Sequence, residues 1–498
     1  MGARRELVAW RFVACFALSL LVYVPRAYRT LCLMGDSAEM VTAAALGGIP
    51  HAPGYPLYVV LGRALRWLPF GELPFRIHLG SAILHAATVA VVALAIEQIT
   101  RRTGPAMLGA ATLALSRVFL AGSLYAEVFP LNDLLFALLL LLAARVADDV
   151  SDGRTWIALS MATGMALSHH QMIALGAPAL LLLVGPGASR VASRHPLRAA
   201  GLLLVTMLIP VASYSLLLIA AARDPLLSWG DVHDFHSLYR LITRQDYGGL
   251  LHASRRPASG QLLERLDAFA LSTGESFGIV ALALSALGVV WGYRHARRPC
   301  AALVLAFVCA GPLFAGTNAV DLHSEYRRAF FERFASMSHV PLAILVGMGA
   351  TEAFDRIRSS PRWSRGLRAS MVSGLLVVLT VVPLVFGTRD LDFSRDDLGA
   401  VYAHDLVASL PEGSLVLLKG DMSTQAALYA CGVERRCGDR IVMAPLQLGL
   451  PWKLEQERRR HPSLFATEDN AFDYSSGDGV AKLVRHELAR RPVAIHGE

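Results

Sequence analysis

The chain has 498 residues, of which 54% are hydrophobic and 17% are charged, and its formal net charge is +8. The charged share lies well below the roughly 25% that is typical of soluble domains. Several stretches of about 18 to 25 residues carry no charge, which is the length that a helix needs to cross a hydrocarbon core of about 30 Å. These features exclude a single soluble globule, a cysteine-rich secreted scaffold and a disordered chain. They predict a polytopic membrane protein.

Apolar runs between clusters of charge predict eleven membrane spans. They lie near residues 9–25, 77–99, 105–124, 130–146, 155–168, 171–186, 199–221, 270–292, 299–317, 335–352 and 370–388. The fifth and sixth spans are short and are separated by Ser168–Gln171. If they formed one long helix, the predicted orientation of every later span and loop would be inverted. The first span has the basic start of a signal peptide, but no A-x-A-like cleavage site follows it. We therefore interpret it as a span.

Arginine clusters precede the first span and follow every second span. They comprise Arg4, Arg5, Arg11, Arg101, Arg102, Arg145, Arg154, Arg190, Arg194, Arg198, Arg294, Arg297, Arg298, Arg356, Arg358, Arg362, Arg365 and Arg368. Such an excess marks cytoplasmic loops, which predicts a cytoplasmic N-terminus, an outer first loop at about residues 26–76 and an outer tail. The arginine-rich composition favours a bacterial inner membrane. Because the basic residues lie between spans, we expect no nucleic-acid partner.

The composition changes after the last span, because 31 of the last 110 residues are charged, against 55 of the first 388. We therefore divide the chain into a transmembrane domain, residues 1–388, and a water-facing domain, residues 389–498. Strand and helix patterns alternate in this tail, which predicts a small parallel α/β domain. The expected order is a helix starting at 394–397, a strand at 414–419, a helix at 423–431, a strand at 440–444, a helix at 479–491 and a strand at 492–496.

Two of the six cysteines lie close together in this tail. An oxidising outer compartment permits a bridge between Cys431 and Cys437. Two unpaired thiols in a helix-to-strand connection are the alternative. The other four cysteines lie within or near the ends of predicted spans and have no obvious partner in the sequence.

The first outer loop carries a distinctive set of polar residues. Asp36 and Glu39 are spaced i, i+3, and His51 and Tyr55 follow in a His-Ala-Pro-Gly-Tyr-Pro run. If a helix begins at Ser37, both acids lie on one face of it. A carboxylate at a membrane boundary is costly unless it is paired or functional. A solvated loop acid and a simple rigid turn are the alternative interpretations.

The other predicted outer loops supply further candidates. These are Glu127, His169, His170, Trp229, Asp231, Arg244, Arg327, Arg328 and Arg333. Glu127 lies at a span end, where an interfacial anchor is the alternative. The two adjacent histidines lack a third metal ligand in their own segment, so we predict no metal site. The last three arginines either pair with Glu325 and Glu332 or form a guanidinium cluster that grips an anionic lipid phosphate.

Taken together, these segments resemble a known family. The matching segments are Gly35–Glu39, Ile49–Tyr58, Ala126–Val128 with Leu131–Asn132, Ser168–His170, Trp229–Asp231 and Glu332–Phe334, in this order. The family is the large group of bacterial membrane proteins related to the eukaryotic endoplasmic-reticulum protein O-mannosyltransferase, within the GT-C glycosyltransferase superfold. The resemblance covers residues of about 30 to 350. One position departs from the family pattern, because Ala52 occupies the second position of the usual His-Pro-Pro sequence.

The resemblance implies a membrane glycosyltransferase that moves a sugar such as mannose from a polyprenyl-phosphate donor to a hydroxyl of a protein or glycan on the outer face. It implies Asp36 as the base, to which we add Glu39 as a positioning residue. The remaining candidates are assigned to substrate binding. A positioned base typically speeds such a step by roughly 10²–10⁴-fold, and outer arginines can stabilise the leaving phosphate without a metal. We expect no tightly bound cofactor, and a divalent-metal requirement and the oligomeric state are left open.

Two other classes of protein fit parts of the pattern. A flippase for lipid-linked sugars would place charged residues along a path through the spans, whereas the acids here cluster at one face. A non-catalytic envelope assembly or binding protein could act through the tail. No phosphate-binding loop of ATPases and no Gly-x-Ser-x-Gly elbow of serine hydrolases on a strand-to-helix turn is evident in the sequence, which disfavours those two classes.

Overall fold

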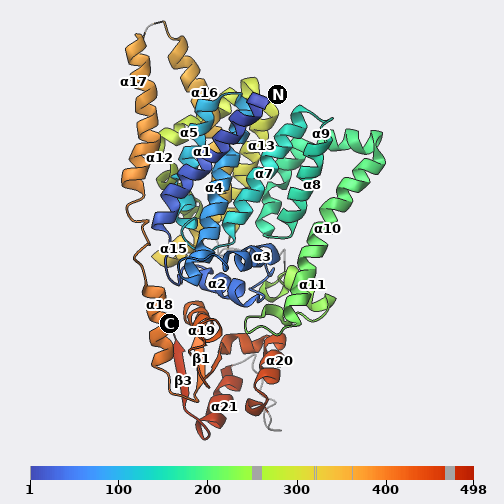
Figure 1. Ribbon diagram of the computed structural model, residues 1–498, viewed down its shortest axis with the longest axis vertical. Helices are drawn as coiled ribbons and strands as arrows, with labels where there is room; N and C mark the ends of the chain where they lie inside the picture. The colour runs from blue at the N-terminus through green and yellow to red at the C-terminus, as the bar shows by residue number, and fades with distance from the viewer. Residues whose placement is uncertain are drawn as a thin grey trace. The chain divides into compact units, whose positions relative to one another are not determined.

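A computed structural model describes residues 2–249, 261–318, 320, 322–361, 363–465 and 477–497. The chain is mainly helical and forms two compact units (Figure 1). Unit 1 consists of Met1–Ala27, His78–Ala212 and Ser254–Ser394. Unit 2 consists of Tyr28–Ile77, Ser213–Ala253 and Arg395–Glu498.

Nine helical segments among the described residues are long and apolar enough to cross a membrane. They are formed by α1 (Gly2–Arg26), α4 (Leu73–Thr100), α7 (Phe129–Asp148), η1 with α9 (Gln171–Gly176, Ala177–Arg194), α10 (Pro196–Ala221), α12 (Gln261–His295), α13 with η4 and α14 (Arg297–Val308, Cys309–Leu313, Phe314–Thr317), α15 with η5 and α16 (Glu325–Glu332, Arg333–Ala335, Ser336–Ser359), and α17 with η6 and η7 (Arg365–Leu376, Val377–Val381, Pro383–Gly387). The predicted class, a mainly helical polytopic membrane protein, is confirmed.

The other two predicted spans lie on shorter helices. The span at 105–124 is divided into α5 (Thr103–Ala114) and α6 (Arg117–Gly122), and the span at 155–168 is α8 (Gly153–Leu167). Each of these helices is shorter than the roughly 17 to 25 residues that a single crossing helix needs. The chain is not helical at His169 and His170, so α8 and α9 are separate helices.

Helix α16 forms the centre of unit 1, where it packs against α5, α7, α12 and α13. Its contact with α12 is close because both helices carry glycine where they meet. A Cβ atom on Gly288 would clash with the carbonyl of Leu345, and one on Gly349 would clash with the carbonyl of Leu284. Small residues of this kind allow helix backbones to approach one another within a membrane.

Helix α9 contains a proline, Pro186, near its middle. A proline has no N–H group, so the carbonyl of Leu182, four residues earlier, loses its usual helical donor. Arg298 at the start of α13 replaces that donor. Its Nε donates to the carbonyl oxygen of Leu182 and its Nη2 to that of Leu183, both at 2.6 Å.

Unit 2 combines short helices with a small sheet. The short helices from the first part of the chain are α2 (Ser37–Leu46), α3 (Pro56–Leu65), η2 (Trp229–Asp231), α11 (Phe235–Ile242) and η3 (Gln245–Tyr247). The C-terminal segment adds α18 (Leu398–Ala408), β1 (Leu415–Lys419), α19 (Asp421–Gly432), β2 (Ile441–Met443), η8 (Pro445–Gly449), α20 (Pro451–Arg460), η9 (Pro462–Leu464), α21 (Gly477–Leu488) and β3 (Val493–Gly497).

The three strands are parallel in the order β2-β1-β3, with Leu415 opposite both Ile441 and Val493. The predicted α/β character of the tail is therefore confirmed, and the sequence pattern missed helix α20. The tail also packs closely on the loop that follows α1, because α19 lies against α2. Leu428 of α19 contacts a cluster formed by Ala43, Val59 and Leu227.

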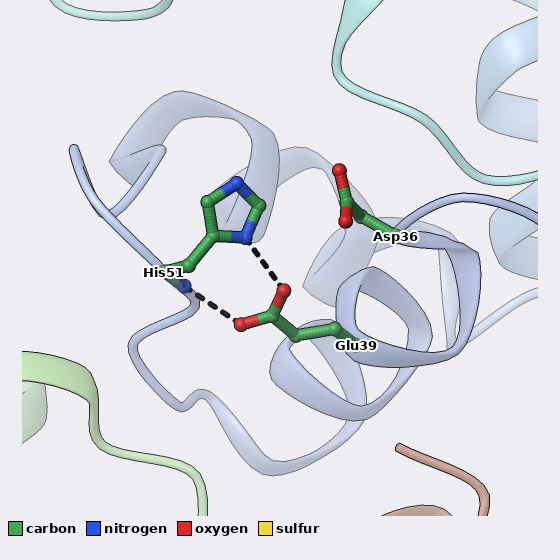
Figure 2. A group of neighbouring side chains, drawn as sticks. All are labelled: Asp36, Glu39 and His51. Carbon is green, nitrogen blue, oxygen red and sulfur yellow. Dashed lines mark hydrogen bonds and ion pairs between the residues drawn. The ribbon is translucent and has the colours of Figure 1, made fainter. Parts of the chain in front are cut away.

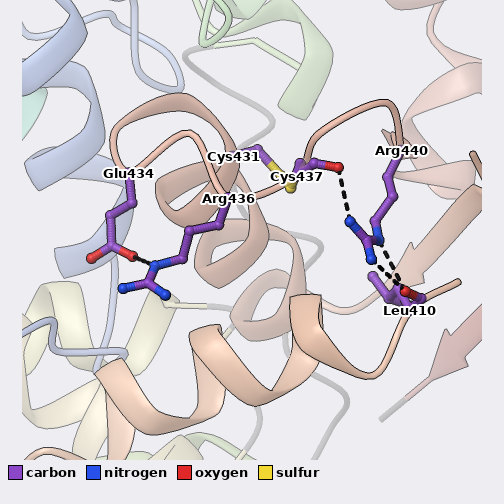
Figure 3. The surroundings of a disulfide bond; sticks show 6 residues. All are labelled: Leu410, Cys431, Glu434, Arg436, Cys437 and Arg440. Atoms are coloured by element: carbon purple, nitrogen blue, oxygen red, sulfur yellow. Dashed lines mark hydrogen bonds and ion pairs between the residues drawn. A yellow bond between two sulfur atoms is a disulfide. The ribbon is translucent and has the colours of Figure 1, made fainter. Parts of the chain in front are cut away.

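Cys431 and Cys437 form a disulfide at the end of α19, with their Cα atoms 4.8 Å apart (Figure 3). Next to it, Glu434 accepts a hydrogen bond from Arg436 at 2.8 Å, and Arg440 donates to the carbonyl of Leu410 at 2.9 Å. The bridge is the first of the two alternatives that the sequence allowed. Cys15, Cys32, Cys300 and Cys309 are buried free thiols.

Candidate functional site

In the loop that follows α1, Glu39 binds His51 through two hydrogen bonds (Figure 2). The backbone N–H of His51 donates to Glu39 Oε1 at 2.7 Å, and His51 Nδ1 lies 2.6 Å from Oε2. Asp36 stands at the N-cap of α2, one turn before Glu39. Ligand atoms of all three side chains lie within 4.8 Å of one another. The predicted helix start at Ser37 thus places both acids beside one histidine.

The turn that carries His51 has a tightly determined backbone. Gly54 donates its N–H to the carbonyl of His51 at 2.9 Å and has a φ of 89°, a left-handed conformation that favours glycine. A Cβ atom on Gly54 would also lie 2.7 Å from Leu217 Cδ1. Tyr55 is buried, and its hydroxyl lies 3.4 Å from His51 Nε2. Both ring nitrogens of His51 therefore have partners within this loop.

The charge state of His51 follows from these contacts. Burial disfavours the protonated ring, but the charges of Glu39 and Asp36 and the hydrogen bond to Glu39 outweigh burial and raise the pKa of His51 to about 9. Arg244 acts in the opposite direction. At neutral pH the group therefore contains a protonated His51 ring that is hydrogen-bonded to Glu39, next to the Asp36 carboxyl group.

Asp36, Glu39 and His51 also form a group that could hold a metal ion, among the residues that the structure describes. Carboxylate oxygen and imidazole nitrogen are common metal ligands. In the structure, however, both oxygens of Glu39 are engaged by His51 donors. A divalent cation would have to displace the ring proton of His51 to bind there. The arrangement as it stands fits proton handling better than metal binding.

The fourth predicted outer loop contributes further residues to unit 2. Trp229 pairs with the first loop through its backbone, donating to the carbonyl of Ile49 at 2.9 Å. Its ring stacks on that of Tyr247, with centroids 6.1 Å apart and 9° between planes. The Arg244 guanidinium lies 5.0 Å from the centroid of the Tyr247 ring. Asp231 binds Arg459 at 2.5 Å.

Tyr247 was not selected from the sequence, although it lies three residues after Arg244. The residue is 41% exposed. Partial burial, followed by the charge of Glu39, raises the pKa of its hydroxyl, and Asp36 adds to the effect. The two acids of the first loop are therefore near enough to influence it. An aromatic residue in a polar loop that the sequence places close to an arginine is the signal that could have found it.

Unit 1 holds a second group of predicted residues around Glu127. Arg333 forms an ion pair with Glu127, and the two side chains are 8% and 1% exposed. The guanidinium lies 3.7 Å from the ring centroid of Phe330 and 5.4 Å from those of Phe129 and Phe334. Arg333 therefore pairs with Glu127, and Glu332 and Glu325, the partners considered from the sequence, are not needed for its neutralisation.

The loop around Glu127 is held by several neighbouring side chains. His78 accepts from the N–H of Ala126 at 2.9 Å, and Ser81 accepts from that of Glu127 at 3.3 Å. His169 donates from Nε2 to the carbonyl of Val128 at 2.8 Å. Burial lowers the pKa of His169 to about 4, although this hydrogen bond opposes the shift, so the ring is neutral.

The remaining predicted residues of unit 1 are dispersed. His170 accepts from the N–H of Met172 at 3.1 Å and caps η1, so its Nδ1 and the Nε2 of His169 are both bound to backbone. Arg328 is exposed on α15, whereas Arg333 is buried. The side chain of Arg327 lies outside the described residues. The structure therefore shows no three-arginine cluster among the side chains that it describes.

Comparison with known proteins adds to this geometry. Residues 36–186 match the family described as the protein O-mannosyl-transferase TMEM260 N-terminal domain. The chain is 25% identical over 448 residues to the mouse protein O-mannosyl-transferase TMEM260, covering 86% of this chain and 62% of the mouse protein. It is 21% identical to the Dictyostelium discoideum protein of the same name, covering 79% of this chain and 52% of that protein.

The chain is thus similar to the TMEM260 protein O-mannosyl-transferases. It spans less than two thirds of the length of either relative. Its fold resembles that of the crystal structure of ArnT from Cupriavidus metallidurans in the apo state, with a TM-score of 0.52 and 14% identity over 91% of this chain and 92% of ArnT. The GT-C glycosyltransferase fold expected from the resemblance is therefore confirmed, and the family match begins at Asp36 itself.

Proposed function

We propose that this chain is a GT-C-type glycosyltransferase that transfers a sugar from a polyprenyl-phosphate donor to a hydroxyl of a protein or glycan acceptor. The observation that carries the proposal is the paired Glu39 and His51 with the Asp36 carboxyl group beside them. This group lies at the start of the segment that matches the O-mannosyl-transferase family. Its half-buried position in a loop between membrane helices suits a lipid-linked substrate.

The reaction is a single displacement at the sugar carbon C1. Asp36 accepts the proton of the acceptor hydroxyl while the acceptor oxygen forms a bond to C1. The bond between C1 and the phosphate oxygen breaks, and its electron pair stays on the lipid phosphate. One displacement inverts the configuration at C1. A positioned base contributes roughly 10²–10⁴-fold to such a step.

Glu39 and His51 support this step without taking the proton themselves. Glu39 orients His51 through both of its oxygens and keeps the ring charged. The charged ring places positive potential next to Asp36, in a partly buried setting where such stabilisation of a developing phosphate charge is strong. Tyr55 fixes the other side of the ring. We assign Trp229 and Asp231 to the walls of the same site.

The arginines divide between two roles in the proposal. Arg244 is near enough to His51 to affect its protonation, so we assign it to the donor phosphate. Exposed Arg328 of unit 1 is an alternative candidate for that role. Arg333 and Glu127, which neutralise each other, hold their loop in place, as do His169 and His170. Arg327 is kept as a further phosphate candidate on its sequence position.

The arginine pattern supports a cytoplasmic N-terminus and an outer location for the site. Polyprenyl-phosphate sugars would then be used on the outer face of the membrane, most simply the bacterial inner membrane. The disulfide in the tail agrees with an oxidising compartment.

A labelled donor distinguishes the three classes of protein that the sequence allowed. The purified full-length chain, reconstituted in vesicles, is incubated with decaprenyl-phosphate-[³H]mannose and bacterial envelope protein. We expect label to appear on acid-precipitable protein or glycan. A flippase would move intact labelled lipid between leaflets, and a binding protein would retain it unchanged. Either outcome without transfer would overturn the proposal.

The variant Asp36→Asn tests the base within the same assay. The isosteric amide cannot accept the proton, so we expect transfer to fall by about 10²-fold or more with an unchanged unfolding temperature. Glu72→Gln, which removes an exposed acid from the same loop, serves as the matched control. Transfer by Asp36→Asn within about tenfold of the wild type would remove Asp36 from the base role. Prior treatment with EDTA is expected to leave the rate unchanged.

A further inference from the structure

Helix α20 of the C-terminal segment is hydrogen-bonded to the fourth outer loop along its length. Gln456 Nε2 donates to the carbonyl of Ser228 at 3.0 Å. Arg459 Nη2 donates to Asp231 Oδ1 at 2.5 Å, and Trp452 Nε1 donates to Asp246 Oδ2 at 3.0 Å. Gln456 and Trp452 are 1% and 6% exposed, so two of these three contacts lie in the interior of unit 2.

The next helical residue extends the same contact. Arg460 Nη2 donates to Asp224 Oδ1 at 2.7 Å and to the carbonyl of Pro225 at 2.6 Å, and its Nη1 donates to the carbonyl of Leu226 at 3.0 Å. The ring of Trp452 also lies against that of Trp229, with centroids 5.5 Å apart. The loop from Asp224 to Asp246 is therefore bound at both of its ends by a single helix.

The same loop segment is bonded on its other side to the turn that carries His51. Ile49 donates its N–H to the carbonyl of Leu227 at 2.9 Å, and Trp229 donates its N–H to the carbonyl of Ile49 at 2.9 Å. These two bonds form a parallel bridge between Ile49 and Ser228. Ser228 lies between Leu227 and Trp229, the two residues that bond to Ile49, and its carbonyl is the group that Gln456 binds. Helix α20 and the start of the His51 turn thus form hydrogen bonds with consecutive residues of segment 227–229.

The bridge fixes the start of the turn, in addition to the buried packing of Ile49 and Ala52. Ile49 stands two residues before His51, whose N–H and ring must both reach Glu39. A displacement of segment 227–229 therefore moves the start of the turn directly. A misplacement of about 1 Å in a catalytic group can lower a rate by about 10²-fold. Loss of the contacts from α20 would loosen the bridge without touching any reacting atom.

We propose that Arg459, Gln456 and Trp452 are positioning residues that hold segment 227–229, and through it the His51 turn, in register with Glu39. The proposal rests on the proposed function, because it concerns the same acid–base group. In this proposal the C-terminal segment helps to position the site, in addition to forming a folded α/β region.

Hydrogen–deuterium exchange of the full-length chain in detergent measures this coupling without any enzyme assay. The test variant is Arg459→Gln, and the control is Arg458→Gln, which removes the same charge one residue earlier. Arg458 lies 4.0 Å from Glu455 of its own helix. We expect Arg459→Gln to speed exchange at the Ile49 and Trp229 amides by about tenfold, with the Arg458→Gln rates equal to those of the wild type.

The amides of β1 report whether the tail itself unfolds. Faster exchange at Ile49 and Trp229 with unchanged β1 rates supports the proposal. Equal exchange in both variants would overturn it. If Arg459→Gln also speeds exchange in β1, the variant Gln456→Met is used instead, because it keeps the side-chain shape and removes the bond to Ser228. Faster exchange at Ile49 and Trp229 with unchanged β1 rates in this variant supports the proposal, and unchanged exchange at both amides overturns it.

The transfer assay supplies a second readout. Arg459→Gln is expected to lower kcat by about tenfold with the donor KM unchanged, and Arg459→Lys, which can still bind Asp231, is expected to restore most of the rate. An Arg459→Gln kcat equal to that of Arg458→Gln would remove the positioning role. If the wild-type chain transfers no label while exchange responds as expected, the proposed function fails and the structural coupling stands.

Discussion

Each unit of the molecule contains a buried acid paired with a basic side chain, and the two pairs differ in what they can do. In unit 1, Arg333 and Glu127 are 8% and 1% exposed and are enclosed by phenylalanine rings. In unit 2, His51 and Glu39 are 15% and 8% exposed and lie beside Asp36. An arginine keeps its charge at any physiological pH, whereas a histidine can lose its charge. The first pair is therefore a fixed tie between segments, and the second can respond to a proton.

The comparison separates stability from chemistry. A fully buried ion pair holds its segments in register, and breaking it leaves one uncompensated charge in an apolar setting. A partly exposed pair with a raised histidine pKa sits where substrate and water can reach its neighbour. Mutations in the two units should therefore have opposite signatures, with stability lost in unit 1 and rate lost in unit 2.

The largest effect is expected from Arg333→Met. This change removes the guanidinium that pairs with the buried Glu127 carboxylate, and breaking such a pair typically costs about 3–5 kcal/mol. The measurement is the unfolding free energy in detergent, taken from denaturant titration. Arg328→Gln, on exposed α15, is the control and should change stability by less than about 0.5 kcal/mol. Equal stability of the two variants would mean that the pair in unit 1 is not a structural tie.

The pair in unit 2 should instead show itself in the pH dependence of the rate. The pKa of His51 is raised to about 9, so the stability that the charged pair contributes is complete below the ordinary histidine pKa of about 6.5 and is lost as the pH rises through about 9. We expect kcat/KM to fall with a midpoint near pH 9. Glu39→Gln should move this midpoint toward lower pH and lower the rate at pH 7.5 by about tenfold.

The profile of kcat/KM against pH in both proteins provides the check. Tyr55→Phe is a useful companion, because it removes the hydroxyl near His51 Nε2 and leaves Glu39 in place. Its midpoint should lie close to that of the wild type. An alkaline midpoint that is the same with and without Glu39 would show that His51 does not control the rate.

A smaller effect is expected from Arg244→Lys. A guanidinium matches phosphate with two parallel hydrogen bonds and an ammonium does not, so donor affinity should fall by about tenfold although the charge is kept. Equilibrium binding of decaprenyl phosphate measures the change. Arg436→Lys, in the tail, is the control. If Arg328→Lys weakens binding and Arg244→Lys has no effect, the phosphate contact belongs to unit 1.

The last prediction concerns accessibility and should leave rate and stability unchanged. A membrane-impermeant thiol reagent applied to cells with a permeabilised outer membrane should label Cys431 and Cys437 only after reduction of their disulfide. Cys300, buried in unit 1, serves as the unlabelled reference. Labelling of the pair only after the inner membrane is broken would place the tail in the cytoplasm. The site in unit 2 would then face the opposite compartment.

Local patterns in the sequence were sufficient to predict most of the elements. Charge-free runs located the membrane helices, and alternating strand and helix patterns located β1, β2 and β3 to within a few residues. The break between α5 and α6 was missed, because the predicted span continues through Leu115 and Ser116, where the helix is interrupted. Helix α20 was missed because its charged sequence shows no apolar period.

The candidate site was predictable only where its residues are close in sequence. Asp36 and Glu39 were found from their spacing, and the helix at Ser37 explains why they share a face. The partner of Arg333 could not be found, because Glu127 is 206 residues away. The contact of Arg459 with Asp231 spans 228 residues. Such pairings arise when distant segments pack, and neither composition nor local spacing records them.

The hydrogen bonds from Arg298 to α9 have a consequence for how the protein is made. The carbonyl of Leu182 accepts a hydrogen bond from Arg298, which lies 116 residues later in the chain and is therefore synthesised after α9. In lipid, an unsatisfied carbonyl costs several kcal/mol, so α9 gains its full stability in the bilayer only when α13 has been synthesised and has docked. Until then, through the synthesis of α10, α11 and α12, we expect α9 to be less stable than in the finished protein. Assembly of the bundle is expected to be gated by the arrival of one arginine.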